Sequence, residues 1–324
     1  MSRKGNLFST NADGIHFIDS GPNNHIRNCR VVRTLDDALV MDSHDIATVP
    51  VGMPRRATRI TVARAGQFLF PNGTAVNFID PDSAEELTGA TIVRQDPPDT
   101  DPPVAGGPVT LYFDQPLPPL AAGSGMTFAS EDRRGARSSI ERNHVENILF
   151  GRGIWIGGSA GIVILNNKVG HTSNGGIVVY QAAKSSPMPP AYPLPPAHDI
   201  TIQYNVVDGS LGPMASGSGT QTALGGIQVD SVNQYGAFVS SPPNTNISIQ
   251  FNRVLSSGRS GIWVGQLNGG TIRYNSVIGW NLYPHLPIFG VSAAEAAQLQ
   301  QDFTRPLVVR NCQNVSVSDN LMVP

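Results

Sequence analysis

The six residues Ile164-Leu165-Asn166-Asn167-Lys168-Val169 follow the pattern I-x-x-N-x-V, which recurs along this chain of 324 residues. The other copies run from Ile140 to Val145, Ile202 to Val207, Ile249 to Val254 and Ile272 to Val277, with degenerate copies from Ile26 to Val31 and from Val317 to Met322. The fourth place is asparagine in every copy except the first, where it is Cys29. Because asparagine tolerates left-handed backbone and bonds to nearby main chain, this column predicts an asparagine ladder inside stacked turns.

A second phrase alternates with the first, and consists of a small residue followed by a strand-like run. The small residues are Gly14, Ala38, Gly153, Gly176, Gly226 and Gly261. Asp13 and Asp37 lie 24 positions apart in this phrase, which suits one turn of a coil. Side chains alternate between the two faces of a strand, so Ile15, Ile154 and their equivalents should all point into the coil. The sequence therefore predicts an all-β right-handed parallel β-helix.

The opposite parity of the second phrase is expected to form the outer face of one sheet. It carries His16, Asp42, Trp155, Tyr180, Gln228, Asp230 and Trp263. The Pro-, Ser- and Gly-rich segments 182–199, 208–224 and 231–244 leave from similar places in successive turns. Insertions on one side of a solenoid usually build the walls of its binding face, so we expect these loops to flank the outer sheet.

Residues 50–137 interrupt the repeat with Pro-rich and alternating segments, such as Ala75-Val76-Asn77-Phe78-Ile79. Turn residues such as Asn72-Gly73 separate these segments, which is typical of an antiparallel module. We therefore expect three parts: β-helix rungs over 1–49, an inserted β-rich module over 50–137, and a continuation of the β-helix over 138–324.

Composition excludes several classes of function. A formal net charge of -2 and the absence of a dense Lys or Arg run argue against a nucleic-acid partner. The sequence has no stretch near eighteen apolar residues and no signal-peptide core at Met1, so we expect neither a membrane partner nor an export signal in this chain. Cys29 and Cys312 are too far apart to suggest a metal cluster, and we expect no cofactor.

Three aspartates are the strongest candidates for catalysis. Asp13 and Asp37 occupy the same position in consecutive repeats, with Asp36 beside them. Adjacent strands lie about 4.8 Å apart, so the three carboxyl groups should share one patch. Close like charges raise at least one pKa, which would leave one group as a proton donor and another as a base. Arg152 follows in the same column, where it could bind substrate or hold a carboxylate ionised.

Each of these candidates also has a structural interpretation. The aspartates could simply cap solenoid turns, and Arg152 could only pair with a neighbouring acid. His16 and His44 could be ordinary surface or turn histidines. Trp155, Tyr180 and Trp263 could line a groove that stacks sugar rings, or the loops could fold over and bury them.

The sequence resembles the pectin-lyase-like β-helix proteins. Asn11-Ala12-Asp13-Gly14-Ile15 and Asp36-Asp37-Ala38 resemble the pattern of family 28 polygalacturonase-type hydrolases, although Gly151-Arg152-Gly153 stands where that family has Gly-His-Gly. A closer likeness is to the α-1,3-galactosidases of glycoside hydrolase family 110. These also have an Asp-Asp-Ala segment, a β-rich insert after it, and an Arg-Gly-Ile rung where the coil resumes, as in Arg152-Gly153-Ile154.

The resemblance implies a glycoside hydrolase, inverting in type, that cleaves a galactoside or related polysaccharide. Asp13, Asp36 and Asp37 would be catalytic, while Arg152 would bind substrate. From their place on or beside the outer face, and not from the resemblance, we expect the substrate-binding set to include also His16, Asp42, His44, Trp155, Tyr180, Gln228, Asp230 and Trp263. The alternatives are a polysaccharide lyase or epimerase, and a non-catalytic carbohydrate-binding or structural solenoid.

The resemblance further implies a secreted or periplasmic protein. The repeat begins within a dozen residues of Met1. An uncapped coil end exposes strand edges and core, so we expect a fragment without earlier rungs, or self-association through that end.

Overall fold

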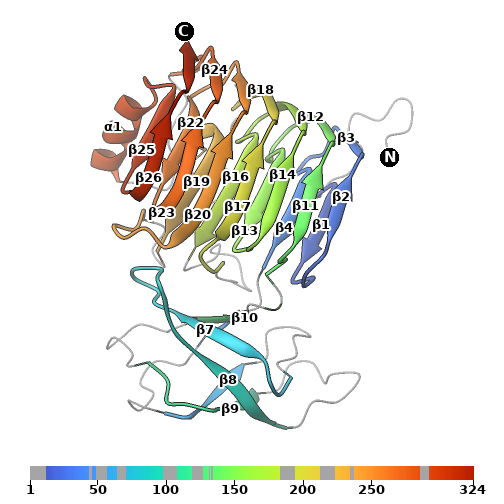
Figure 1. Ribbon diagram of the computed structural model, residues 1–324, viewed down its shortest axis with the longest axis vertical. Coiled ribbons are helices and arrows are strands. Elements are labelled where there is room, and N and C mark those ends of the chain that lie inside the picture. The colour runs from blue at the N-terminus through green and yellow to red at the C-terminus, as the bar shows by residue number, and fades with distance from the viewer. Residues whose placement is uncertain are drawn as a thin grey trace.

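The computed structural model describes residues 12–43, 46–48, 57–63, 71–97, 108–118, 127–130, 132, 134–182, 194–211, 223–233, 237–284 and 292–324. Within these ranges the chain is a right-handed parallel β-helix with an antiparallel module on one side, which confirms the predicted fold (Figure 1). No helix in these ranges is long and apolar enough to cross a membrane.

Three parallel sheets form the described coil, and each successive rung adds one strand to each sheet. The first sheet contains β1 (Ile15–Ile18), β4 (Leu39–Asp42), β13 (Ile154–Gly157), β16 (Ile177–Ala182), β19 (Gly225–Val232), β22 (Ser260–Gly265) and β25 (Leu307–Arg310). The second contains β2 (His25–Arg27), β11 (Ser138–Glu141), β14 (Ile162–Leu165), β17 (His198–Gln203), β20 (Asn244–Gln250), β23 (Leu267–Arg273) and β26 (Gln313–Ser318). The third contains β3 (Arg30–Val32), β12 (His144–Ile148), β15 (Lys168–Thr172), β18 (Val206–Ser210), β21 (Arg253–Leu255), β24 (Ser276–Ile278) and β27 (Leu321–Val323).

The interior of the coil is packed with aliphatic side chains from all three sheets. In the first sheet Leu39, Ile154, Ile177 and Ile227 stand in register and are fully buried, as their parity predicts. At the glycines of the second phrase, the space that a side chain would need is filled by a valine of the third sheet. A Cβ on Gly153 would lie 2.1 Å from Cγ1 of Val169, so only glycine fits there.

The predicted asparagine ladder is present at the turn between the second and third sheets. The amide oxygen of Asn205 accepts hydrogen bonds from the backbone N–H and the side chain of Asn167, both at 2.9 Å. Asn205 in turn donates to Asn252 in the same way. The left-handed residue is the one before each asparagine, for example Tyr204 with φ 56°, so the ladder exists for its side-chain bonds and not for its backbone conformation.

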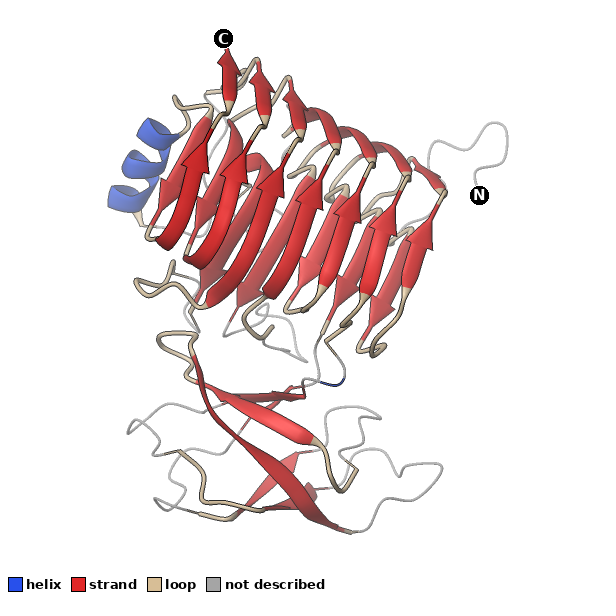
Figure 2. Cartoon of the chain, viewed as in Figure 1, coloured by secondary structure: helices blue, strands red, loops and turns tan. Residues whose placement is uncertain are grey.

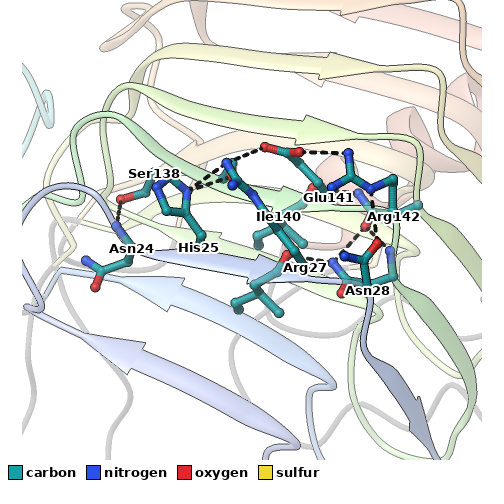
Figure 3. A network of polar contacts seen from close by, with 12 residues as sticks. Asn24, His25, Arg27, Asn28, Ser138, Ile140, Glu141 and Arg142 are labelled. Atoms are coloured by element: carbon teal, nitrogen blue, oxygen red, sulfur yellow. Dashed lines mark hydrogen bonds and ion pairs between the residues drawn. The ribbon is translucent and has the colours of Figure 1, made fainter.

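The coil continues across the insertion without losing register. Strand β2 pairs with β11, 114 positions later. Arg27 forms an ion pair with Glu141 at 3.0 Å, and Arg142 donates to Oδ1 of Asn28 at 3.0 Å (Figure 3). The rungs on either side of the module are therefore neighbours in space.

The module is a six-stranded antiparallel sheet. Its order is β5 (Ile46–Thr48), β10 (Thr127–Ser130), β7 (Ala75–Ile79), β8 (Glu86–Asp96), β9 (Pro108–Phe113) and β6 (Arg59–Ala63). Strand β5 lies before residue 50, where the sequence suggested that the module starts. The buried Arg134 binds Glu86 at 2.6 Å and so joins the coil to the module.

A helix that the sequence analysis did not anticipate, α1 (Ala293–Asp302), lies beside the last rungs (Figure 2). Ser292 caps it by accepting a hydrogen bond from the N–H of Glu295. Leu299 is fully buried and packs with Trp263 of the first sheet. The helix therefore covers part of the outer face of the first sheet, which the sequence predicted to be flanked only by loops.

Candidate active site

Asp13, Asp36 and Asp37 come together at the start of the first sheet. The pairing of Ile15 with Leu39 places Asp13 and Asp37 on adjacent rungs, as expected. One carboxylate oxygen from each of the three residues lies within 4.8 Å of the others. Asp36 is exposed and the Asp13 side chain is 21% exposed, so two of the three carboxylates face solvent.

Asp37 is the buried member of this acid trio. Its Oδ1 accepts the backbone N–H of Arg152 and its Oδ2 accepts a guanidinium N–H, both at 2.6 Å. Burial raises the pKa of Asp37 to about 6, although the charge and the N–H of Arg152 act in the opposite direction. Asp37 can therefore carry a proton at mildly acidic pH while a cation stands ready to stabilise its carboxylate.

His16 holds a second carboxylate of the trio in place. Its Nδ1 lies 2.7 Å from Oδ2 of Asp13, and its Nε2 lies 3.0 Å from Oδ1 of Asp42. Partial burial acts to lower the pKa of His16, but the hydrogen bonds to Asp13 and Asp42 and their charges outweigh it and raise this pKa to about 10. Both ring nitrogens are engaged, so His16 positions Asp13 and is not free to bind substrate as the sequence suggested.

The aromatic residues of the first sheet do not form an open groove. Tyr180 and Trp263 are buried, at 4% and 0% exposure. Tyr180 packs with Leu194 and Val232. The structure therefore supports the second of the two interpretations, in which other parts of the chain fold over these rings.

Trp155 is half-buried, and groups of this chain occupy the space around its ring. The guanidinium carbon of Arg152 lies 4.6 Å from the centroid of this ring. On the sheet, a Cβ on Gly157 would come within 3.3 Å of Cζ2 of Trp155. We conclude that Trp155 packs against Arg152 and the sheet, and that it supports the Asp37 ion pair.

Asp230 and Gln228 are buried at 1% and 2% exposure, so they do not line an accessible binding face either. The side chain of Gln228 donates to Oδ2 of Asp230 at 3.2 Å, and no hydrogen bond reaches Oδ1 from the described residues. Burial raises the pKa of Asp230 to about 8, against the opposing effects of Gln228 and Arg152. Asp230 is thus a protonated acid at neutral pH.

The raised pKa values of Asp230 and His16 make the free energy of unfolding depend on pH. Asp230 keeps its proton in the folded state up to about pH 8, whereas the unfolded chain loses it near 3.8, so unfolding becomes easier as pH rises through this window. We expect the free energy of unfolding in urea to fall between pH 5 and 8, and this slope to flatten in Asp230→Asn. His16→Gln serves as a control between pH 5 and 6.5, because the stability that His16 adds is lost only between about pH 6.5 and 10. Equal slopes in wild type and Asp230→Asn over pH 5 to 8 would contradict the assignment.

His44 lies outside the described residues. Sequence reasoning missed Phe150, whose side chain is 42% exposed. Its N–H donates to the carbonyl of Leu35 at 3.2 Å, which places its backbone beside that of Asp36 on the next rung. The signal was present, because Phe150 directly precedes the Gly151-Arg152-Gly153 segment that aligns with the Asp pair.

The acid trio could in principle offer oxygen ligands to a hard divalent cation. However, both oxygens of Asp37 already accept hydrogen bonds from Arg152, so a cation would compete with the guanidinium. The arrangement suits proton transfer better: a buried acid with a raised pKa faces two more accessible carboxylates.

Comparisons with known proteins add little to this geometry. No protein-family model and no curated protein matches the chain. Among solved structures, the tailspike protein gp49 from Pseudomonas phage LKA1 is 11% identical with a TM-score of 0.32, over 84% of this chain and 51% of that one. The tailspike gp61 of Pseudomonas phage phi297 is 12% identical with a TM-score of 0.27, over 83% and 50%. The chain thus spans about half the length of these tailspikes, and likenesses this weak carry no argument about activity.

Proposed function

We propose that this protein is a glycoside hydrolase whose acid and base come from the acid trio. The observation that carries the proposal is the contrast within the trio: Asp37 is buried with a pKa raised to about 6, and Asp13 and Asp36 are accessible carboxylates nearby. Two carboxyl groups with different environments are what glycosidic bond cleavage requires. The sequence likeness to family 110 and family 28 hydrolases points the same way, and it suggests a galactoside or a related polysaccharide.

In this mechanism Asp37 donates its proton to the leaving glycosidic oxygen as the bond to the anomeric carbon breaks. Arg152 then stabilises the new carboxylate of Asp37 through its two hydrogen bonds. The imidazolium of His16 holds Asp13, which with Asp36 faces the anomeric carbon or the attacking water. Each proton given by Asp37 is regained when water is consumed, so the enzyme returns to its starting state.

The spacing bears on stereochemistry. Carboxyl groups about 5 Å apart suit retention, and those roughly 6.5–9.5 Å apart suit inversion. The one oxygen of each residue that lies within 4.8 Å of the other two fits the shorter spacing. A retaining reaction, in which Asp13 or Asp36 attacks the anomeric carbon, is therefore the first to test, ahead of the inverting one that the resemblance implied.

The test is a hydrolysis screen of the purified protein with chromogenic α- and β-glycosides, galactan and galacturonan. The anomer of the first product is read by proton NMR, and absorbance at 235 nm reports lyase products. Release of sugar supports the proposal, whereas a rise at 235 nm without hydrolysis moves the protein to the lyases.

One observation favours a second candidate, a non-catalytic solenoid. Asp37 and Arg152 lie on either side of the insertion, so their ion pair also fastens the coil where the module leaves it. If no substrate is cleaved, and if breaking this pair lowers only the melting temperature, the aspartates are structural.

A further inference from the structure

A groove of about 440 Å³ lies on the outer side of the third sheet, near the turn that leads to the first sheet. We call it the third-sheet groove. Its lining includes Leu149, His171, Asp208, Ser256, Leu282 and Tyr283. Its volume falls within the range of small-ligand sites.

Gly209 forms part of the floor of the groove without contributing a side chain. Gly170 and Asp208 stand in register on β15 and β18, and the next residue in each strand, His171 or Gly209, has left-handed backbone. A Cβ on Gly209 would lie 3.1 Å from Cδ2 of His171, so the imidazole ring lies against the Gly209 backbone. These features leave a hollow bordered by His171 and Asp208.

The far wall of the groove comes from the segment after β24. The N–H of Leu282 donates to the carbonyl of Ser257, and that of Tyr283 donates to the carbonyl of Gly258. The side chains of Leu282 and Tyr283 are 48% and 37% exposed. Leu282 and Tyr283 therefore present partly exposed apolar surface along this wall of the groove.

One end of the groove lies next to the rung of the acid trio. Leu149 lines the groove, and its N–H donates to the carbonyl of Thr34, two residues before Asp36. The exposed Phe150 follows Leu149 in the chain, and its N–H donates to the carbonyl of Leu35, the residue before Asp36. Rungs are about 4.8 Å apart, so the groove runs about 14 Å along the coil axis from Leu149 to Ser256.

The lining selects one kind of occupant. Tyr283 and Leu282 offer apolar contact, while Asp208, His171 and Ser256 offer hydrogen-bonding groups. Aromatic contact combined with scattered polar groups suits the apolar faces and hydroxyls of sugar units. Asp208 and nearby Glu146, which lies 3.9 Å from His171, disfavour an anionic chain.

We propose that the third-sheet groove binds the outer units of a neutral saccharide chain that extends from the acid trio along the coil axis. The inference rests on the proposed function and makes it more specific: the substrate is an oligosaccharide or polysaccharide, cleaved at one end of an extended site.

The groove is tested with Tyr283→Ala and a matched control, Tyr204→Ala. Tyr204 is 50% exposed but lies at the turn between the second and third sheets, away from the groove. The first measurement is retention on a printed array of defined glycans, which needs no turnover. We expect wild type and Tyr204→Ala to retain the same neutral glycans, and Tyr283→Ala to lose at least five-fold in affinity. Equal retention by both variants, or retention of no glycan by wild type, would overturn the inference.

The second measurement is hydrolysis of galacto-oligosaccharides of two to six units. A groove that binds outer units predicts that kcat/KM rises with chain length and that Tyr283→Ala raises KM for the longer chains at least five-fold. No length dependence would overturn the link between groove and acid trio. Retention that depends on Tyr283 without hydrolysis of any glycoside would overturn the proposed hydrolase and leave the groove as a saccharide site.

Discussion

Replacing Asp37 by asparagine is expected to lower hydrolysis by roughly 10²–10⁴-fold, the usual contribution of a general acid. The amide keeps the size of the carboxyl group and can still accept the backbone N–H of Arg152, but it has no proton of the right acidity to give. Initial rates on the best substrate of the screen measure the effect.

In wild type, activity should also decline as pH rises past about 6, where Asp37 loses its proton.

The control for stability is Arg152→Met, which breaks the same ion pair and leaves the carboxyl group in place, so it measures the loss of stability that the ion pair alone explains. If Asp37 is the general acid, Asp37→Asn should still unfold cooperatively on heating. Its rate of hydrolysis should fall far more than the increase in unfolded protein can explain. Activity in Asp37→Asn equal to that of wild type, at matched folded fraction, would exclude Asp37 from catalysis.

Replacing Asn205 by leucine is expected to destabilise the coil by about 3 kcal/mol or more, because it leaves several buried polar groups without partners. Asn205 is fully buried. Its oxygen accepts two hydrogen bonds from Asn167, and its amide donates to Asn252 and to the carbonyl of Ile164. Urea unfolding followed by circular dichroism measures the loss.

Asn320→Leu provides the comparison for the ladder. Asn320 accepts the same two hydrogen bonds from Asn275, but it is only half-buried. The polar groups that lose their partner in Asn320→Leu can therefore bind water. We expect a clearly smaller loss of stability. Equal losses at Asn205 and Asn320 would show that the ladder does not depend on burial.

Sequence reasoning succeeded where one side chain repeats at one place in each turn. The asparagine column and the inward isoleucines follow from period alone, and the shared position of Asp13 and Asp37 follows from the same alignment. The alternation of side chains along the strand also indicated that Trp263 points out of the coil. This alternation could not show that Leu299 and Phe303 cover the Trp263 ring, because those residues lie in a helical segment outside the repeat.

The electrostatics of the site were harder to predict for a related reason. His16 lies between Asp13 and Asp42 because of side-chain rotamers, which sequence spacing does not define. The groove combines Gly209 in its floor with a wall from Leu282 and Tyr283, so no single motif marks it.

The inserted module has a consequence for how the chain closes its coil. An ordinary rung brings together residues 24 positions apart, such as Ile140 and Ile164, whereas the rung across the module joins Ile26 to Ile140, 114 positions apart. Loop-closure entropy grows only with the logarithm of loop length, so even as a flexible loop the insertion costs about 1.4 kcal/mol more than an ordinary turn. The hydrogen bonds shown in Figure 3 can offset a penalty of that size. A coil of this kind can therefore accommodate a long inserted segment at a single turn, and it places few requirements on the sequence of that segment.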